Sequence, residues 1–151
     1  MTLGRKRKLG DVYAFILPNG QYAFAHVLQE AAIGVYKHLG TSLNDLPTDN
    51  NEYMFIISVY RSVFSKWIFI ENRPFETEDD AWAPPRCMYD RIGQSFHQYY
   101  RGKIIPSTKE ECVGLEPMAV WNECHLICRI MEGDKWKRWF PNYSGLIDNL
   151  S

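Results

Sequence analysis

The sequence predicts a mainly β (α+β) domain: a curled antiparallel sheet or a small, partly open barrel, with one C-terminal helix packed on it. Three observations lead to this prediction. Two apolar runs near the start are joined by a turn sequence, two later runs are short and rich in β-branched and aromatic residues, and a capped amphipathic segment lies near the end.

The first two strands are predicted over Val12 to Leu17 and Gln21 to Leu28. They flank Pro18-Asn19-Gly20. Asn-Gly between two apolar runs is typical of a tight hairpin, because both residues tolerate a positive φ.

Residues 23–39 allow two interpretations. Apolar residues from Phe24 to Leu39 follow the spacing of an amphipathic helix. Against a helix, large and small residues alternate over 22–28, and Gly34 would cost a helix interior about 1 kcal/mol. We favour strands here and keep the helix as the alternative.

The remaining elements follow from composition and capping. Tyr53 to Tyr60 and Trp67 to Ile70 are short, β-rich runs bounded by polar residues, which favours strands. A helix is predicted to begin after Asn122 and to end at Gly133. We expect this helix to pack on a sheet through one apolar side. That side is predicted to carry Trp121, Cys124, Cys128 and Met131, with Leu126, Ile127 and Ile130 widening the stripe.

Length and charge limit the possible classes of protein. The 151 residues, 46% of them hydrophobic, predict a single domain over 1–151. Lys+Arg 17 against Asp+Glu 18 gives a net charge of -1, which argues against a general polyanion binder. No apolar run reaches the roughly 20 residues of a membrane span, and the apolar stretch after Arg5 to Lys8 is too short for a secretion signal. We therefore expect a cytoplasmic protein that does not contact membranes.

The four cysteines, Cys87, Cys112, Cys124 and Cys128, do not form the pattern of a disulfide framework, so reduced thiols are expected. Cys124 and Cys128 lack the second clustered pair that structural zinc needs. Their i, i+4 spacing instead predicts packing residues on one helix face, and no metal is expected.

Catalytic patterns are also missing. Gly93-Gln94-Ser95-Phe96-His97 approaches a nucleophile elbow, but histidine replaces the final glycine that the sharp turn requires. No histidine has a carboxylate or nucleophile partner at a diagnostic spacing, and no phosphate-binding glycine loop is present. We therefore expect no catalytic residues, no cofactor and no enzymatic activity. A pocket that holds His97 or His125 against a carboxylate would instead support a small hydrolase.

A series of short segments, in a fixed order, covers most of the chain. They are Lys6 to Ala14, Asn19 to Phe24, Gly34 to Tyr36, Trp67 to Ile70, Glu111 to Glu116 and Ala119 to Trp121, followed by His125 and Arg129. Together they resemble the Immunity protein 26 family. The sequence departs from the family pattern at Pro117-Met118 and at Leu126 to Cys128.

The resemblance implies a bacterial immunity protein, encoded beside a secreted polymorphic toxin, that inhibits the toxin stoichiometrically. The residues within the family-like segments are expected to be scaffold: Asp11 would tie the backbone where the first strand begins, and Glu116 would meet a backbone amide or Arg129. This expected scaffold set consists of Gly10, Asp11, Gly114, Leu115, Glu116 and Trp121.

The strongest charge asymmetry lies between Glu71 and Trp82, with five acids and one base. An acidic segment with aromatic anchors suits an inhibitor of a basic toxin domain, such as a basic nuclease. A solvated loop is the alternative interpretation. The expected partner-binding residues are Glu76, Glu78, Asp79, Asp80 and Trp82.

The alternative function is a small β-barrel that binds nucleic acid. It is suggested by the basic cluster Arg5 to Lys8 and by the mixed aromatic and basic segments Tyr99 to Arg101 and Trp136 to Trp139. Four bases in a nearly neutral chain more often form a solvated chain end, so we place this function second.

Overall fold

The computed structural model describes residues 6–48 and 52–139, which form two compact units. The first contains the described residues up to Ala83 together with Val120–Glu123, and the second contains Pro84–Ala119 and the described residues from Cys124 onward. Arg5, part of the basic N-terminal cluster, lies outside the described residues. Whether 1–151 behaves as a single domain stays a prediction.

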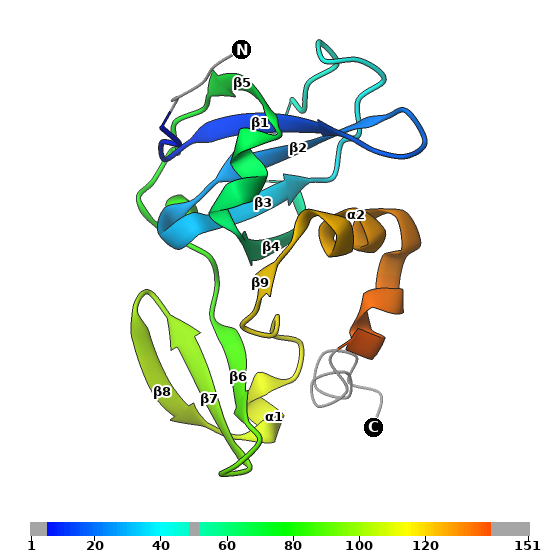
Figure 1. The fold of residues 1–151 in the computed structure, drawn as a ribbon. Coiled ribbons are helices and arrows are strands. Elements are labelled where there is room, and N and C mark those ends of the chain that lie inside the picture. Colours follow the sequence, from blue (N-terminus) through cyan, green and yellow to red (C-terminus); the bar gives the residue numbers. More distant parts are fainter. Residues whose placement is uncertain (1–5, 49–51, 140–151) are drawn as a thin grey trace. The chain divides into compact units, whose positions relative to one another are not determined.

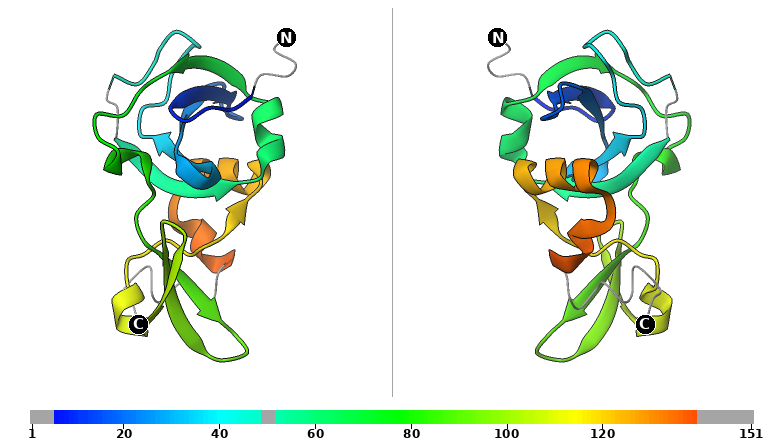
Figure 2. Two further views of the ribbon diagram at one scale, coloured as in Figure 1. Left: turned by 90° about the vertical axis from the view of Figure 1, so that its left-hand side faces the viewer. Right: turned by 90° about the vertical axis from the view of Figure 1, so that its right-hand side faces the viewer.

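The first unit is built on a six-stranded sheet in the order β5-β1-β2-β3-β4-β9 (Figure 1). Neighbouring strands are antiparallel except for the parallel pair β4–β9. Figure 2 shows the strong curl of this sheet. The mainly β class is confirmed, and in the part of the chain that the structure describes the sheet does not close into a barrel. The strands are β1 Asp11–Ile16, β2 Tyr22–Val27, β3 Ala32–Tyr36, β4 Tyr53–Val59, β5 Ile68–Asn72 and β9 Val120–Trp121.

The predicted N-terminal hairpin is confirmed. Its turn is closed by hydrogen bonds from Leu17 N to Gln21 O (2.8 Å) and from Gly20 N to Leu17 O (2.9 Å). Gly20 has φ +88°, a conformation that glycine adopts without the steric cost of a side chain. The strands predicted over 53–60 and 67–70 are confirmed as β4 and β5.

Residues 23–39 form strands joined by the short 3-10 turn η1 Gln29–Ala31, so the preference for strands is confirmed. The helix-like periodicity has a simple cause, since the sheet is covered on both faces. Tyr13 packs on one side against Phe64, while Phe24 packs on the other with Leu43. When both faces are buried, apolar residues occupy almost every position and satisfy a helical spacing by chance.

The first face of the sheet carries an aromatic cluster. The 3-10 helix η2 Arg61–Ser65 brings Phe64 to within 5.3 Å of Tyr13, measured between ring centroids. Trp67 stacks on Phe15 at 4.3 Å and donates a hydrogen bond from Nε1 to the Glu123 carboxylate at 2.7 Å. Aromatic contacts of this kind stabilise a core beyond their buried area.

The second unit contains a three-stranded antiparallel sheet that sequence reasoning did not predict. Its strands are β6 Arg86–Asp90, β7 Ser95–Tyr100 and β8 Lys103–Ser107, followed by the single-turn helix α1 Lys109–Cys112. Strand β7 is half-buried along its whole length and mixes polar with aromatic residues, so it lacks an apolar alternation. The small core of this unit joins Cys87 and Cys112 with Phe96 and Leu115.

The predicted C-terminal helix is α2 Glu123–Glu132, which Gly133 follows at φ +66°. The 3-10 helix η4 Gly133–Trp139 comes next. The predicted packing face is wrong for Cys124, which is exposed, and for Met131, which is 40% exposed. Leu126, from the wider part of the predicted stripe, is buried, and so is Arg129. Leu126 lies on the opposite side from Cys124, and its larger apolar side chain gains more from burial. None of the described helices is long and apolar enough to cross a membrane.

Candidate functional site

The acidic segment is defined here as residues 76–82, which follow β5 in the first unit. The carboxylates of Glu76, Glu78, Asp79 and Asp80 are exposed, and Trp82 is half-buried. Within the segment, Asp79–Ala81 forms the 3-10 turn η3, and Trp82 N donates to Asp79 O at 3.1 Å. The expected partner-binding acids therefore lie on the surface.

The chain just before this segment is held at Arg73 by three hydrogen bonds in series. Gly10 N donates to Val27 O at 2.9 Å, Arg73 N donates to Gly10 O at 2.8 Å, and His26 Nε2 donates to Arg73 O at 2.8 Å. Gly10 has φ +87°, and a Cβ atom there would lie 2.9 Å from Arg73 O. The close approach of these two backbones therefore requires glycine at position 10.

His26 is fully buried and uses both ring nitrogens. A carbonyl oxygen only accepts, so Nε2 carries the proton that binds Arg73 O. In that tautomer Nδ1 accepts from the Tyr53 hydroxyl at 2.8 Å. Phe75 stacks on the imidazole at 4.5 Å, measured between centroids, so the residue just before the acidic segment is anchored on a buried ring.

Tyr53 reaches His26 because Gly34 leaves room for it. Gly34 is the β3 partner of His26, and Tyr53 comes from the next strand, β4. A Cβ atom on Gly34 would lie 2.5 Å from the Tyr53 ring, and its three nearest atoms all belong to that ring. The Tyr53 ring therefore occupies the space above Gly34, and its hydroxyl reaches His26 on β2.

Arg73 belongs to the same polar cluster as His26 and Tyr53. Its Nε atom donates to the Glu71 carboxylate at 2.5 Å, and its guanidinium lies 5.7 Å from the centre of the Tyr36 ring. Burial, followed by the electrostatic interactions with Tyr36 and Asp80, raises the pKa of Tyr53 well above its usual range. Burial also raises the pKa of Tyr36. Both hydroxyls are thus neutral at physiological pH, which suits a structural clamp better than acid–base chemistry.

A hollow of about 340 Å³ lies beside the acidic segment in the first unit. Its lining combines the apolar side chains of Leu9, Pro74 and Phe75 with the carboxylates of Glu76 and Glu78. The volume falls at the lower end of the range for ligand-binding pockets. The mixed lining suits a side chain that has an apolar stem and a positively charged end.

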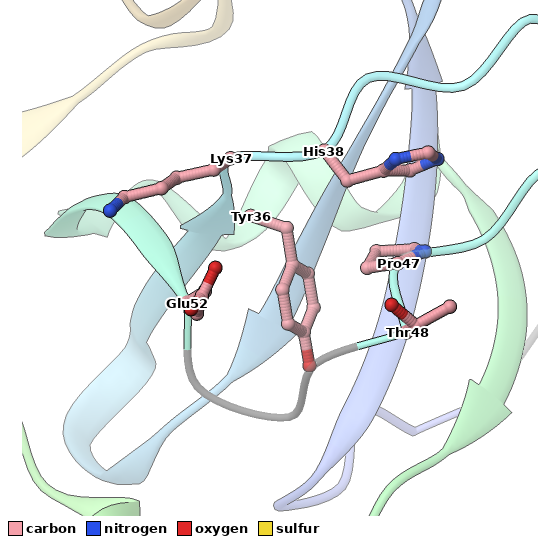
Figure 3. A pocket seen from close by; sticks show the side chains of 6 residues that line it. All are labelled: Tyr36, Lys37, His38, Pro47, Thr48 and Glu52. Carbon is pink, nitrogen blue, oxygen red and sulfur yellow. The ribbon is translucent and has the colours of Figure 1, made fainter.

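A second, smaller cavity of about 100 Å³ lies near the end of β3 (Figure 3). Figure 3 shows the Tyr36 ring between Glu52 on one side and Pro47 and Thr48 on the other. This volume holds only a few water molecules and is too small for most organic ligands.

His38, at the rim of this cavity, has a carboxylate partner that the sequence analysis did not find. Its Nε2 atom lies 3.0 Å from Asp45 Oδ1 and 2.9 Å from Asp45 O, seven residues along the chain. The hydrogen bond from Thr41 N, and then the charge of His38, lower the pKa of Asp45. Because Asp45 accepts from His38 and from Thr41, the arrangement closes the loop 38–45 rather than activating a nucleophile.

The expected scaffold residues in the first unit stabilise strand starts and the core. Asp11 is fully buried and accepts from Lys8 N at 2.9 Å and from Asn72 Nδ2 at 3.0 Å, so it ties the backbone where β1 begins. Trp121 is 3% exposed and pairs with Val59 of β4.

The other scaffold residues belong to the second unit. Gly114 has φ +86°, and Leu115 packs on the Cys87 and Cys112 core. Glu116 accepts two hydrogen bonds from Arg129, which is only 7% exposed. The expected pairing of Glu116 with Arg129 therefore forms, and Trp136 covers the guanidinium at 3.9 Å.

The remaining expectations concern metals and catalysis. Among residues 6–48 and 52–139, no group of three or more His, Cys, Asp or Glu side chains is placed to hold a metal ion. The expectation of no cofactor and no enzymatic activity stays a prediction.

Comparison with protein-family models found no match to this chain, and neither did comparison with curated proteins or with solved structures.

Proposed function

We propose that this chain is a bacterial immunity protein that binds a cognate secreted toxin domain in the cytoplasm and neutralises it by covering its active surface. Two lines of support come together in this proposal. The sequence resembles the Immunity protein 26 family, and the family-like residue Gly10 holds the backbone of Arg73, just before the acidic segment.

The observation that carries the proposal is that the chain leading into the acidic segment is fixed. Arg73 is bound through its backbone N–H and its carbonyl, and Phe75 is stacked on the buried His26. A segment that is ordered before binding loses little conformational entropy when a partner docks. Exposed carboxylates on such a segment attract a basic partner over long range and raise the association rate.

The partner is therefore a protein with a basic surface, as a nuclease toxin domain would have. A lysine or arginine of the toxin would place its stem along Phe75 and its charge between Glu76 and Glu78. Trp82 would supply contact area, since tryptophan is enriched among the residues that dominate binding energy. Inhibition by occlusion requires neither a cofactor nor a catalytic residue.

The test measures binding to the protein encoded by the adjacent open reading frame. The double variant Glu78→Gln/Asp79→Asn removes two charges from the acidic segment, and the matched control Glu110→Gln/Glu132→Gln removes two exposed charges elsewhere. We expect the first variant to slow association and to weaken its salt dependence, and the control to leave both unchanged. Trp82→Ala should mainly speed dissociation.

Equal effects of the two double variants would reject the acidic segment as the interface. Tight binding of DNA or RNA by the purified chain, falling steeply with salt and needing no protein partner, would overturn the proposal in favour of the nucleic-acid-binding class.

A further inference from the structure

Three sulfur-containing side chains share the exposed side of helix α2. Cys124, Cys128 and Met131 stand at i, i+4 and i+7 within Glu123–Glu132, a spacing that places them on one helical face. The buried residues of this helix, Leu126 and Arg129, lie on the other side. The sulfur face, defined by these three residues, therefore lies opposite the buried side of the helix.

Exposure of this face is unusual for cysteine. Cys124 is exposed, Cys128 is partly exposed, and Met131 is 40% exposed. The other two cysteines, Cys87 and Cys112, are completely buried in the core of the second unit. Cysteine is among the residue types most often buried, so a pair left in contact with water points to the reactivity of the thiols rather than to packing.

The three sulfur atoms are able to converge. Cys124 and Cys128 are neighbours on successive turns of the helix. Long helical side chains lean toward the N-terminus of the helix, which directs Met131 toward Cys128. Methionine has three rotatable bonds, so its thioether is able to adjust to a common centre between the thiols.

We propose that Cys124, Cys128 and Met131 form a binding site for a soft monovalent metal ion, with Cu(I) as the ion that fits best. Thiolate and thioether ligands select Cu(I), whereas Mg²⁺ and Ca²⁺ require oxygen ligands. Structural zinc takes four ligands, and this face has three sulfur atoms. When Cu(I) binds, two S–H bonds become two S–Cu bonds, two protons pass to the solvent, and the oxidation state of copper does not change.

The site is tested with the reduced full-length chain and Cu(I) supplied as its coloured bicinchoninate complex without oxygen. We expect one equivalent of Cu(I) to move to the protein, seen as a loss of the chelator's visible absorbance. Cys124→Ser/Cys128→Ser should abolish this transfer, and Met131→Leu should weaken affinity by about tenfold or more. X-ray absorption of the loaded protein should show sulfur neighbours around copper.

His125→Ala is the matched control, because it changes an exposed side chain on the same helix and should leave the affinity unchanged. All variants keep the buried Cys87 and Cys112, and circular dichroism checks that each one is folded. Transfer of Cu(I) that persists in the double serine variant would place the metal elsewhere and overturn the proposal. Failure of the unmodified chain to withdraw Cu(I) from bicinchoninate would overturn it as well.

Discussion

Gly34→Ala is the substitution whose effect the structure specifies most fully. The new Cβ atom would lie 2.5 Å from the Tyr53 ring, whereas carbon atoms in contact lie about 3.5–4.0 Å apart. The ring must therefore move by roughly 1 Å or more. Such a shift carries its hydroxyl, now 2.8 Å from His26 Nδ1, out of hydrogen-bonding range and leaves a buried nitrogen without its partner.

The expected cost follows from these two effects. Overpacking costs about 1–3 kcal/mol, and an unsatisfied buried polar group costs about 1–3 kcal/mol. Alanine recovers about 0.5–1 kcal/mol relative to glycine within a strand. The free energy of unfolding should therefore fall by about 3 kcal/mol. For a protein of this size that corresponds to a decrease in Tm of about 6–12 °C.

Urea and thermal unfolding, followed by tryptophan fluorescence, measure this loss, and a second background isolates its cause. In a Tyr53→Ala protein the ring is gone and His26 has already lost its partner, so adding Gly34→Ala should cost almost nothing. The coupling between the two substitutions should then reach about 2 kcal/mol or more. A Gly34→Ala cost that is the same in both backgrounds would refute the packing of Tyr53 over Gly34.

Three further predictions concern charge, pH and the sheet edge. Tyr53 has a raised pKa in the folded protein, so the stability tied to its protonated form is present below about pH 10 and is lost as the pH rises further. In urea unfolding at alkaline pH, the free energy of unfolding should therefore fall less for Tyr53→Phe than for the unmodified chain. Equal decreases would contradict this prediction. Glu116→Ala should lower the free energy of unfolding, measured in urea, by about 2–4 kcal/mol, because the buried charge of Arg129 loses the Glu116 carboxylate. A decrease below about 0.5 kcal/mol would show that this ion pair does not stabilise the fold. Pro106→Val should increase self-association in sedimentation velocity. Pro106 lies on the edge strand β8 at a position whose N–H would point away from β7, so valine there would offer a backbone donor to a strand of another molecule. An unchanged monomer fraction would count against that register.

Part of the candidate site could be read from the sequence, since the acidic residues of 76–82 are surface side chains in a charge run. The cluster that anchors them could not. His26, Tyr53 and Arg73 are brought together by the pairing of β2, β3 and β4 and by the return of the chain after β5. No local sequence pattern predicts that His26 contacts a tyrosine 27 residues away, because the contact depends on strand register.

By itself, the sequence determined the features that depend on neighbouring residues: the hairpin turn at Asn19-Gly20, the strands β4 and β5, and the beginning and end of α2. Tertiary structure alone decided which part of the apolar stripe of α2 is buried. It also decided that both faces of β2 and β3 are covered, which made strand and helix patterns look alike. The physical reason is that turns and caps are governed by local backbone preferences, whereas burial depends on what distant segments place against each face.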